Sequence, residues 1–182
     1  MSEKLYPTAD QTVGPYYAIG MEYPEGEQLV ARGQAGSIVL SGYVYDGAGN
    51  PVPDAVVEIW QTDADGNIPA ESGGLVRKPG GFSGFGRSGS DEEGFYGFTT
   101  VLPGATEPGA PRFFAVVVFA RGLLSRLHTR IYVPGPELEG DEFLSRLSPE
   151  RRATLIATPV DGGFRHDINL QGEKETVFLA FN

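Results

Sequence analysis

Residues 112–133 constrain the fold more than any other stretch, because they hold two apolar runs of different pattern around Gly122. The first run, Phe113 to Phe119, is apolar at every position and rich in β-branched and aromatic residues. This predicts a strand that is buried on both faces at the centre of a sheet or sandwich. The second run, Arg126 to Val133, alternates, which predicts a strand with two unlike faces.

One face of this second run carries cations. It would hold Arg126, His128, Arg130 and Tyr132, while the other face would hold Leu127, Thr129, Ile131 and Val133. The chain has 14 Lys plus Arg against 24 Asp plus Glu, yet no acidic residue lies between Pro108 and Pro136. Four arginines fall in that interval: Arg112, Arg121, Arg126 and Arg130. A small anion would be attracted here and repelled elsewhere. The alternative is a solvated edge strand that its charges protect from aggregation.

The composition of the whole chain narrows the class of protein. Its 182 residues are 40% hydrophobic, which predicts one domain with a proper core. There is no cysteine, so disulfides and thiolate metal sites are impossible. A net charge of −10 argues against nucleic acid and anionic membranes as partners. No run resembles a signal peptide or a membrane span, and we expect a cytoplasmic protein.

Short apolar runs between Gly- and Pro-rich turns predict seven or eight strands. Besides the two central runs they include Ser37–Tyr45, Ala55–Thr62, Phe95–Val101, Phe164–Leu170 and Thr176–Phe181. Ser148 can cap a short helix that has Pro149 at its first position. The expected fold is all-β, an antiparallel β-sandwich over residues 36–182 with one or two short helices in a connection. Residues 1–35 are expected to form an irregular arm that contacts a partner.

Residue types alone indicate no activity. The only histidines, His128 and His166, are far apart, and no Gly-x-Ser-x-Gly motif is present. The segment Asp63–Asn67 resembles the start of a calcium loop, but the twelfth position is Gly74 rather than Glu, so a polar turn is expected. The Gly/Ser-rich residues 69–94 lack the Gly-Lys-Ser/Thr of a phosphate loop. Trp60, the only tryptophan, is more typical of a core than of a site.

Seven stretches, spread in order over nearly the whole chain, together resemble the intradiol ring-cleavage dioxygenases. They are Gln11-Thr12-x-Gly14-Pro15-Tyr16, Gly42-x-Val44-x-Asp46, Val57-Glu58-Ile59-Trp60-Gln61-Thr62-Asp63, Phe85-Gly86-Arg87, Phe119-Ala120-Arg121-Gly122, Leu127-His128-Thr129-Arg130-Ile131-Tyr132 and Gln171-Gly172-Glu173-x-Glu175-Thr176-Val177-Phe178. Each motif is moderately specific, and the ordered set is much more so.

The resemblance implies a ferric site that this chain has lost. Enzymes of the family hold a non-haem Fe(3+) with two tyrosines and two histidines, and those four positions fall on Ile68, near Thr106, and on Phe113 and Ala115. None of these side chains is a ligand, so no iron is expected on this chain. The all-apolar strand suggests that hydrophobic core fills the former site.

The resemblance also implies a partner and a reaction. Iron-free chains of the family pair with a homologous iron-bearing beta chain, and the active site lies at their interface. This chain would line the substrate pocket with Arg130, Thr12, Gly14, Pro15 and Tyr16, and would supply no catalytic group. The reaction would be cleavage of 3,4-dihydroxybenzoate (protocatechuate) with O₂ to 3-carboxy-cis,cis-muconate, in a higher-order alpha–beta oligomer of the β-ketoadipate pathway.

Two alternatives stay open from the sequence. One is an iron enzyme in its own right that acts on another catechol, against which the missing ligands count. The other is a non-catalytic β-sandwich binding module. The exact catechol, the number of alpha–beta pairs, and whether Arg126 and His128 reach the pocket are not determined by the sequence.

Overall fold

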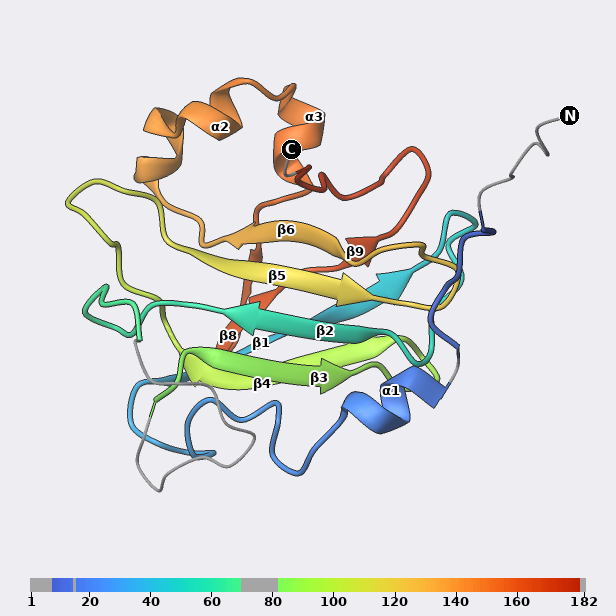
Figure 1. Ribbon diagram of the computed structural model, residues 1–182. Coiled ribbons are helices and arrows are strands. Elements are labelled where there is room, and N and C mark those ends of the chain that lie inside the picture. The colour runs from blue at the N-terminus through green and yellow to red at the C-terminus, as the bar shows by residue number, and fades with distance from the viewer. Residues whose placement is uncertain (1–7, 15, 70–81, 181–182) are drawn as a thin grey trace, which may run out of the picture.

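The computed structural model describes residues 8–14, 16–69 and 82–180, and in it two sheets pack face to face (Figure 1). The first sheet has the strand order β4-β1-β8-β7, and β9 also pairs with β1. Its strands are β1 Ser37–Tyr45, β4 Phe95–Val101, β7 Thr158–Val160, β8 Gly163–Arg165 and β9 Ile168–Asn169. The second has the order β3-β2-β5-β6, built from β2 Val56–Trp60, β3 Phe85–Gly89, β5 Phe113–Phe119 and β6 Leu127–Tyr132. The predicted β-sandwich is confirmed.

Most pairings are antiparallel, as expected, but β1 runs parallel to both β8 and β9. The expected strand Phe164–Leu170 is split, because residues 166 and 167 leave the ladder between β8 and β9. The expected strand Thr176–Phe181 is wrong: in its described part only Leu179 makes an isolated bridge, to His128. Strands β1, β4 and β5 have the predicted bounds.

The hydrophobic core lies between the two sheets, and the side chains on one face of β5 are part of it. Phe114, Val116 and Val118 are at most 1% exposed, whereas Phe113 and its alternate neighbours on the other face are only half-buried. The prediction that β5 is buried on both faces is therefore wrong. The second sheet is an outer layer, and its face that points away from the core is covered in part, by Tyr17 of α1 at Phe119 and by the cluster around Tyr132 at Phe113.

Four short helices accompany the sheets in the described part of the chain. They are α1 Tyr16–Met21, η1 Pro136–Gly140, α2 Glu142–Ser145 and α3 Pro149–Ala153. The start of α3 is as predicted, with the Ser148 hydroxyl accepting from the Arg151 N–H and Pro149 in the first turn. In Figure 1 the last three helices lie beyond β6, where Leu138, Leu144 and Leu155 bury Tyr132. None of the described helices is long and apolar enough to cross a membrane.

Helix α1 and strand β3 are not predicted by the sequence pattern. Helix α1 has only six residues, so its stability comes from packing: Ala18 is buried and the Tyr17 ring lies 5.4 Å from that of Phe119. Strand β3 lies in the Gly/Ser-rich segment that read as a loop. Its Gly86 leaves room for Leu29, because a Cβ there would come within 2.4 Å of the Leu29 side chain.

The segment Asp63–Asn67 forms the expected polar turn. One carboxylate oxygen of Asp63 accepts the backbone N–H groups of Asp65 and Asn67 at 3.0 and 2.8 Å. The other accepts from the Asn67 side-chain amide at 3.0 Å. This turn carries the chain from β2 to Ile68 and so positions the edge of the pocket described next.

Candidate functional site

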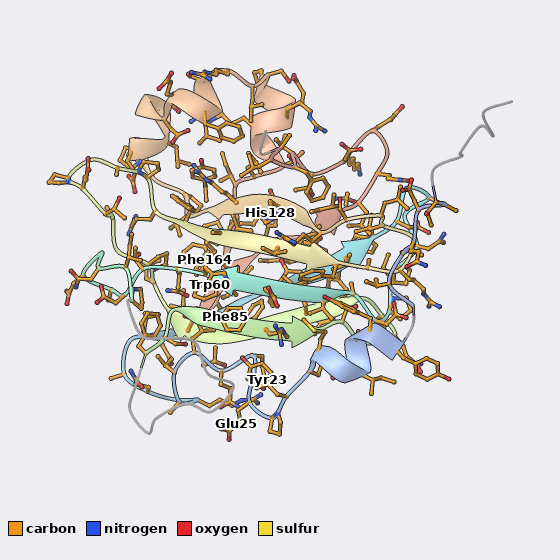
Figure 2. All side chains as sticks on the ribbon, in the orientation of Figure 1. Tyr23, Glu25, Trp60, Phe85, His128 and Phe164 are labelled. Atoms are coloured by element: carbon orange, nitrogen blue, oxygen red, sulfur yellow. The ribbon has the colours of Figure 1, made fainter. Side chains whose placement is uncertain are left out.

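The outer face of the second sheet carries two rows of side chains across four strands. One row runs Phe85, Trp60, Ala115, Arg130, and the next runs Arg87, Glu58, Val117, His128. In Figure 2 Trp60 and Phe85 lie side by side on this face, and their rings are 4.6 Å apart. Trp60 is 48% exposed, so the expectation that it belongs to the core is wrong.

A pocket of about 210 Å³ opens over the first row, at its smallest residue, Ala115. We name it the Ala115 pocket. It is lined by Trp60, Gln61, Thr62, Ile68, Pro69, Gly104, Thr106, Pro111, Phe113 and Ala115. The four positions expected to correspond to the family's iron ligands, from three separate segments, therefore meet in one place. The expectation that hydrophobic core fills the former site is wrong, because those side chains line an open pocket.

The residues of the Ala115 pocket do not fit a ferric ion. Iron in such sites is held by imidazole, phenolate or carboxylate groups, and the lining has none. Its hydrogen-bonding side chains are largely occupied: the Gln61 amide bonds to Thr100 and to two backbone carbonyls, and the Thr62 hydroxyl donates to the Gly104 carbonyl. Across the described residues no group of three or more His, Cys, Asp or Glu side chains could hold a metal.

Arg130 stands beside this pocket and forms no ion pair with a described acidic residue. Its guanidinium lies 4.5 Å from the centroid of the Phe113 ring and donates to the Tyr132 hydroxyl at 3.1 Å. Burial raises the pKa of Tyr132, so the hydroxyl stays neutral near pH 7 and cannot neutralise the cation. Within the described part of the chain Arg130 has no acidic partner, unlike Arg112, which pairs with Glu137 at 3.1 Å.

A second pocket, of about 500 Å³, lies at the other end of β5, under the N-terminal segment. We name it the Thr12 pocket. Its lining is Gln11, Thr12, Val13, Tyr17, Phe119, Ala120, Leu123, Leu124, Ser125 and Arg126. The Thr12 hydroxyl accepts the Gly122 N–H at 2.8 Å and so ties the arm to the β5–β6 turn.

The cation of the Thr12 pocket is Arg126. Its Nε donates to Nε2 of His128 at 3.1 Å. Burial and the Arg126 charge both lower the pKa of His128, so the imidazole is neutral at pH 7 and can accept this bond. Arg126, like Arg130, has no ion pair among the residues that the structure describes.

The five residues predicted to bind substrate are not gathered in one pocket. Thr12 and Arg126 line the Thr12 pocket. Arg130 lies on β6, four residues after Arg126 and on the same face, but it does not line that pocket. Gly14 is exposed with no atom within 4 Å of an added Cβ, and Tyr16 is 81% exposed. Pro15 lies outside the described residues.

The sequence leaves the role of Arg126 open and indicates no role for Arg87. The alternation along this segment places Arg126 on the same face as Arg130, and this pattern could have indicated a binding role for Arg126. Arg87 donates to the Glu58 carboxylate at 2.8 and 2.5 Å and to the Met21 carbonyl at 2.9 Å, so it joins the sheet to the end of α1. Both charged side chains are at most 14% exposed.

Comparison with known proteins settles the family. A family model described as dioxygenase matches residues 12–111. The chain is 37% identical to a protocatechuate 3,4-dioxygenase alpha chain from Pseudomonas putida, over 98% of both chains. The chain belongs to the intradiol ring-cleavage dioxygenase family. It is also 34% identical to a protocatechuate 3,4-dioxygenase beta chain from Burkholderia cepacia, over 83% of this chain and 69% of that one.

A solved structure supports the same assignment at the level of the fold. It is the dioxygenase domain of a dioxygenase–carbohydrate-binding fusion protein from Streptomyces sp. SirexAA-E. The two structures superpose with a TM-score of 0.58 and 26% identity, over 90% of this chain and 96% of that one. The β-sandwich of this dioxygenase family member is thus the family's fold.

Proposed function

We propose that this chain is the iron-free alpha subunit of a protocatechuate 3,4-dioxygenase, working at a site shared with an iron-bearing beta chain. The single observation that carries the proposal is the Ala115 pocket. The four positions expected to correspond to the family's iron ligands meet there, and Ile68, Thr106, Phe113 and Ala115 line the pocket. A dioxygenase fold whose described pocket lining offers no metal donor would take its iron chemistry from a second chain.

The surface of the chain supports a partner on this side of the molecule. Large apolar side chains are exposed on α1 and on the β5–β6 turn: Tyr16 at 81%, Ile19 at 73% and Leu124 at 66%. These residues flank or line the Thr12 pocket. Exposed apolar groups gathered around one pocket are typical of an interface. We propose that the homologous beta chain covers this region and that residues 1–35 contribute to the contact, in a higher-order alpha–beta oligomer.

At the shared site this chain would bind and orient substrate. An arginine offers a planar fork of donors that matches a carboxylate such as that of 3,4-dihydroxybenzoate. Arg130 is the residue that the family motif indicates, and Arg126 is the one that lies with Thr12. The Thr12 hydroxyl, held by the Gly122 N–H, would fix the position of the ring, while Gly14, Pro15 and Tyr16 would form the wall beside it. Burying these groups against the partner would also exclude water.

The chemistry itself would come from the partner's ferric ion, which in this family activates the catechol for reaction with O₂. Both oxygen atoms would enter between the two hydroxylated carbons, giving 3-carboxy-cis,cis-muconate from protocatechuate. Among the described residues neither histidine lines either pocket: His128 is bonded to Arg126, and His166 is buried.

The proposal is tested by purifying this chain alone and together with its beta homologue. We expect bound iron and protocatechuate-dependent O₂ uptake only in the joint preparation. Stoichiometric iron with activity in the chain alone would overturn the proposal. Failure to form a complex with any iron-bearing homologue would favour the non-catalytic binding module instead.

A further inference from the structure

We propose that Arg87 is a positioning residue, which holds helix α1 across the second sheet and so fixes the N-terminal wall of the Thr12 pocket. That wall consists of Gln11, Thr12 and Val13, which lie a few residues before α1 in the chain. Arg87 lines neither pocket, so it would act only through the helix. The part of the inference that concerns substrate rests on the proposed function, whereas the placement of α1 does not.

Helix α1 lies across the outer face of the second sheet, over a row that runs Gly89, Val56, Phe119 from β3 to β5. At the start of the helix the Tyr17 ring packs on Phe119. Just after its end Glu22 lies on Gly89, where an added Cβ would overlap the Glu22 carboxylate. Val56, between these two contacts, is fully buried. The helix is therefore seated on the sheet at both ends.

The helix depends on the sheet for its end. A helix of six residues is too short to be stable by itself, and its last turn has no basic residue to bond with its free carbonyls. Arg87 supplies that cation from β3, because its Nη1 donates to the Met21 carbonyl at 2.9 Å. Its backbone N–H donates to the Gly26 carbonyl at 2.8 Å, and its guanidinium lies 5.6 Å from the centroid of the Tyr23 ring. One residue thus holds the end of α1 and the turn that follows.

The Glu58 carboxylate fixes the direction of the guanidinium. It accepts from Nε of Arg87 at 2.8 Å and from Nη2 at 2.5 Å, and Nη1 remains for the Met21 carbonyl. Both charged side chains are at most 14% exposed, so salt screens the pair weakly. A lysine has a single ammonium in place of the planar fork and cannot make both sets of bonds in this geometry. R87K therefore keeps a charge beside Glu58 and removes the tie to the helix.

The test is residue-resolved amide exchange by NMR on the full chain alone. The Tyr17 and Glu22 amides report on α1, since both bond to carbonyls of this segment. The Gly122 amide reports on the pocket wall, because it donates to the Thr12 hydroxyl. In R87K we expect exchange at these amides to become roughly tenfold faster or more, while the amides of β1 keep their wild-type rates.

The matched control is R151K. Arg151 also donates to a backbone carbonyl of a distant segment, that of Glu175 at 2.5 Å, but it lies on α3. R151K should leave exchange in α1 and at Gly122 at the wild-type rate.

A disulfide can replace the tie that R87K removes, since the chain has no cysteine of its own. An added Cβ at Gly89 would lie 3.3 Å from Cγ of Glu22, which puts E22C/G89C within reach of a disulfide. Combined with R87K, the oxidised form should restore slow exchange in α1 and at Gly122, and the reduced form should not.

Three results would overturn the proposal: unchanged exchange in α1 of R87K, an increase spread equally over α1 and β1, or no rescue by the oxidised disulfide. The second would mean that Arg87 contributes only to global stability. In the assembled enzyme R87K should raise the KM for protocatechuate several-fold at nearly constant kcat, and R151K should not. Faster exchange without a change in KM would leave Arg87 as the residue that places α1 and would remove the Thr12 wall from the substrate site, so the two failures are distinguishable.

Discussion

Acidification should destabilise the fold through His166. Its imidazole is 5% exposed, and Nε2 has no hydrogen-bond partner in the described structure. Burial lowers the pKa of His166 from 6.5 to about 4, against a smaller opposing effect of the neighbouring Asp167 carboxylate. A proton therefore binds the unfolded chain more tightly than the folded one. The resulting stability is fully present above pH 6.5 and is lost as the pH falls through that value toward 4.

The magnitude follows from those two pKa values. Between pH 7.5 and pH 4.5 the linkage removes roughly 2–3 kcal/mol from the free energy of unfolding. That is a large part of the ~5–15 kcal/mol by which single domains are stable. The loss is close to 1.4 kcal/mol per pH unit in the middle of this window, so it should appear as a steep fall in the urea midpoint.

The assay is urea unfolding of the full chain at several pH values, for the wild type and for H166Q. Glutamine does not titrate in this range, and carboxylate effects are common to both proteins, so the difference between the two curves isolates His166. We expect the wild type to lose roughly 2–3 kcal/mol more than H166Q between pH 7.5 and 4.5. Parallel curves would refute the argument that burial keeps this imidazole neutral.

Three further predictions follow from single contacts. R130A in the assembled enzyme should raise the KM for protocatechuate roughly tenfold or more with little change in kcat, because one charge-assisted hydrogen bond is lost; an unchanged KM would remove Arg130 from the shared site. R87A should lower the free energy of unfolding by about 3 kcal/mol in urea, since it leaves the Glu58 carboxylate buried without its cation. R146A, which breaks an exposed pair, is the control and should cost less than about 0.5 kcal/mol. S148A should lose about 1 kcal/mol by the same assay, and no loss would mean that the cap of α3 contributes nothing.

The sequence pattern predicted secondary structure correctly where the residues that determine an element all lie within one short segment. The strands β1, β4 and β5 have their predicted bounds, and Ser148 with Pro149 begins a helix as expected. Alternation along β6 correctly put Arg130 on the outward face, opposite the buried Ile131. These features depend on backbone geometry and side-chain period, which act over a few residues.

Burial was harder to predict, because it depends on what lies across from each face. β5 is apolar at all seven positions, yet one face lies outside the sandwich. Tryptophan is common in protein cores, yet Trp60 lies at the rim of the Ala115 pocket. Helix α1 has no local signal, and the contact of Tyr17 with Phe119 brings together residues a hundred positions apart.

The sequence by itself determined the class of fold, the family and the cationic strand, because each is a matter of residue identity and short-range order. Only the tertiary structure decided that Ile68, Thr106, Phe113 and Ala115 line one open pocket, and that Thr12 lies with Arg126 rather than Arg130. Such neighbourhoods arise from strand register and from the packing of segments distant in the chain, and no local pattern encodes them.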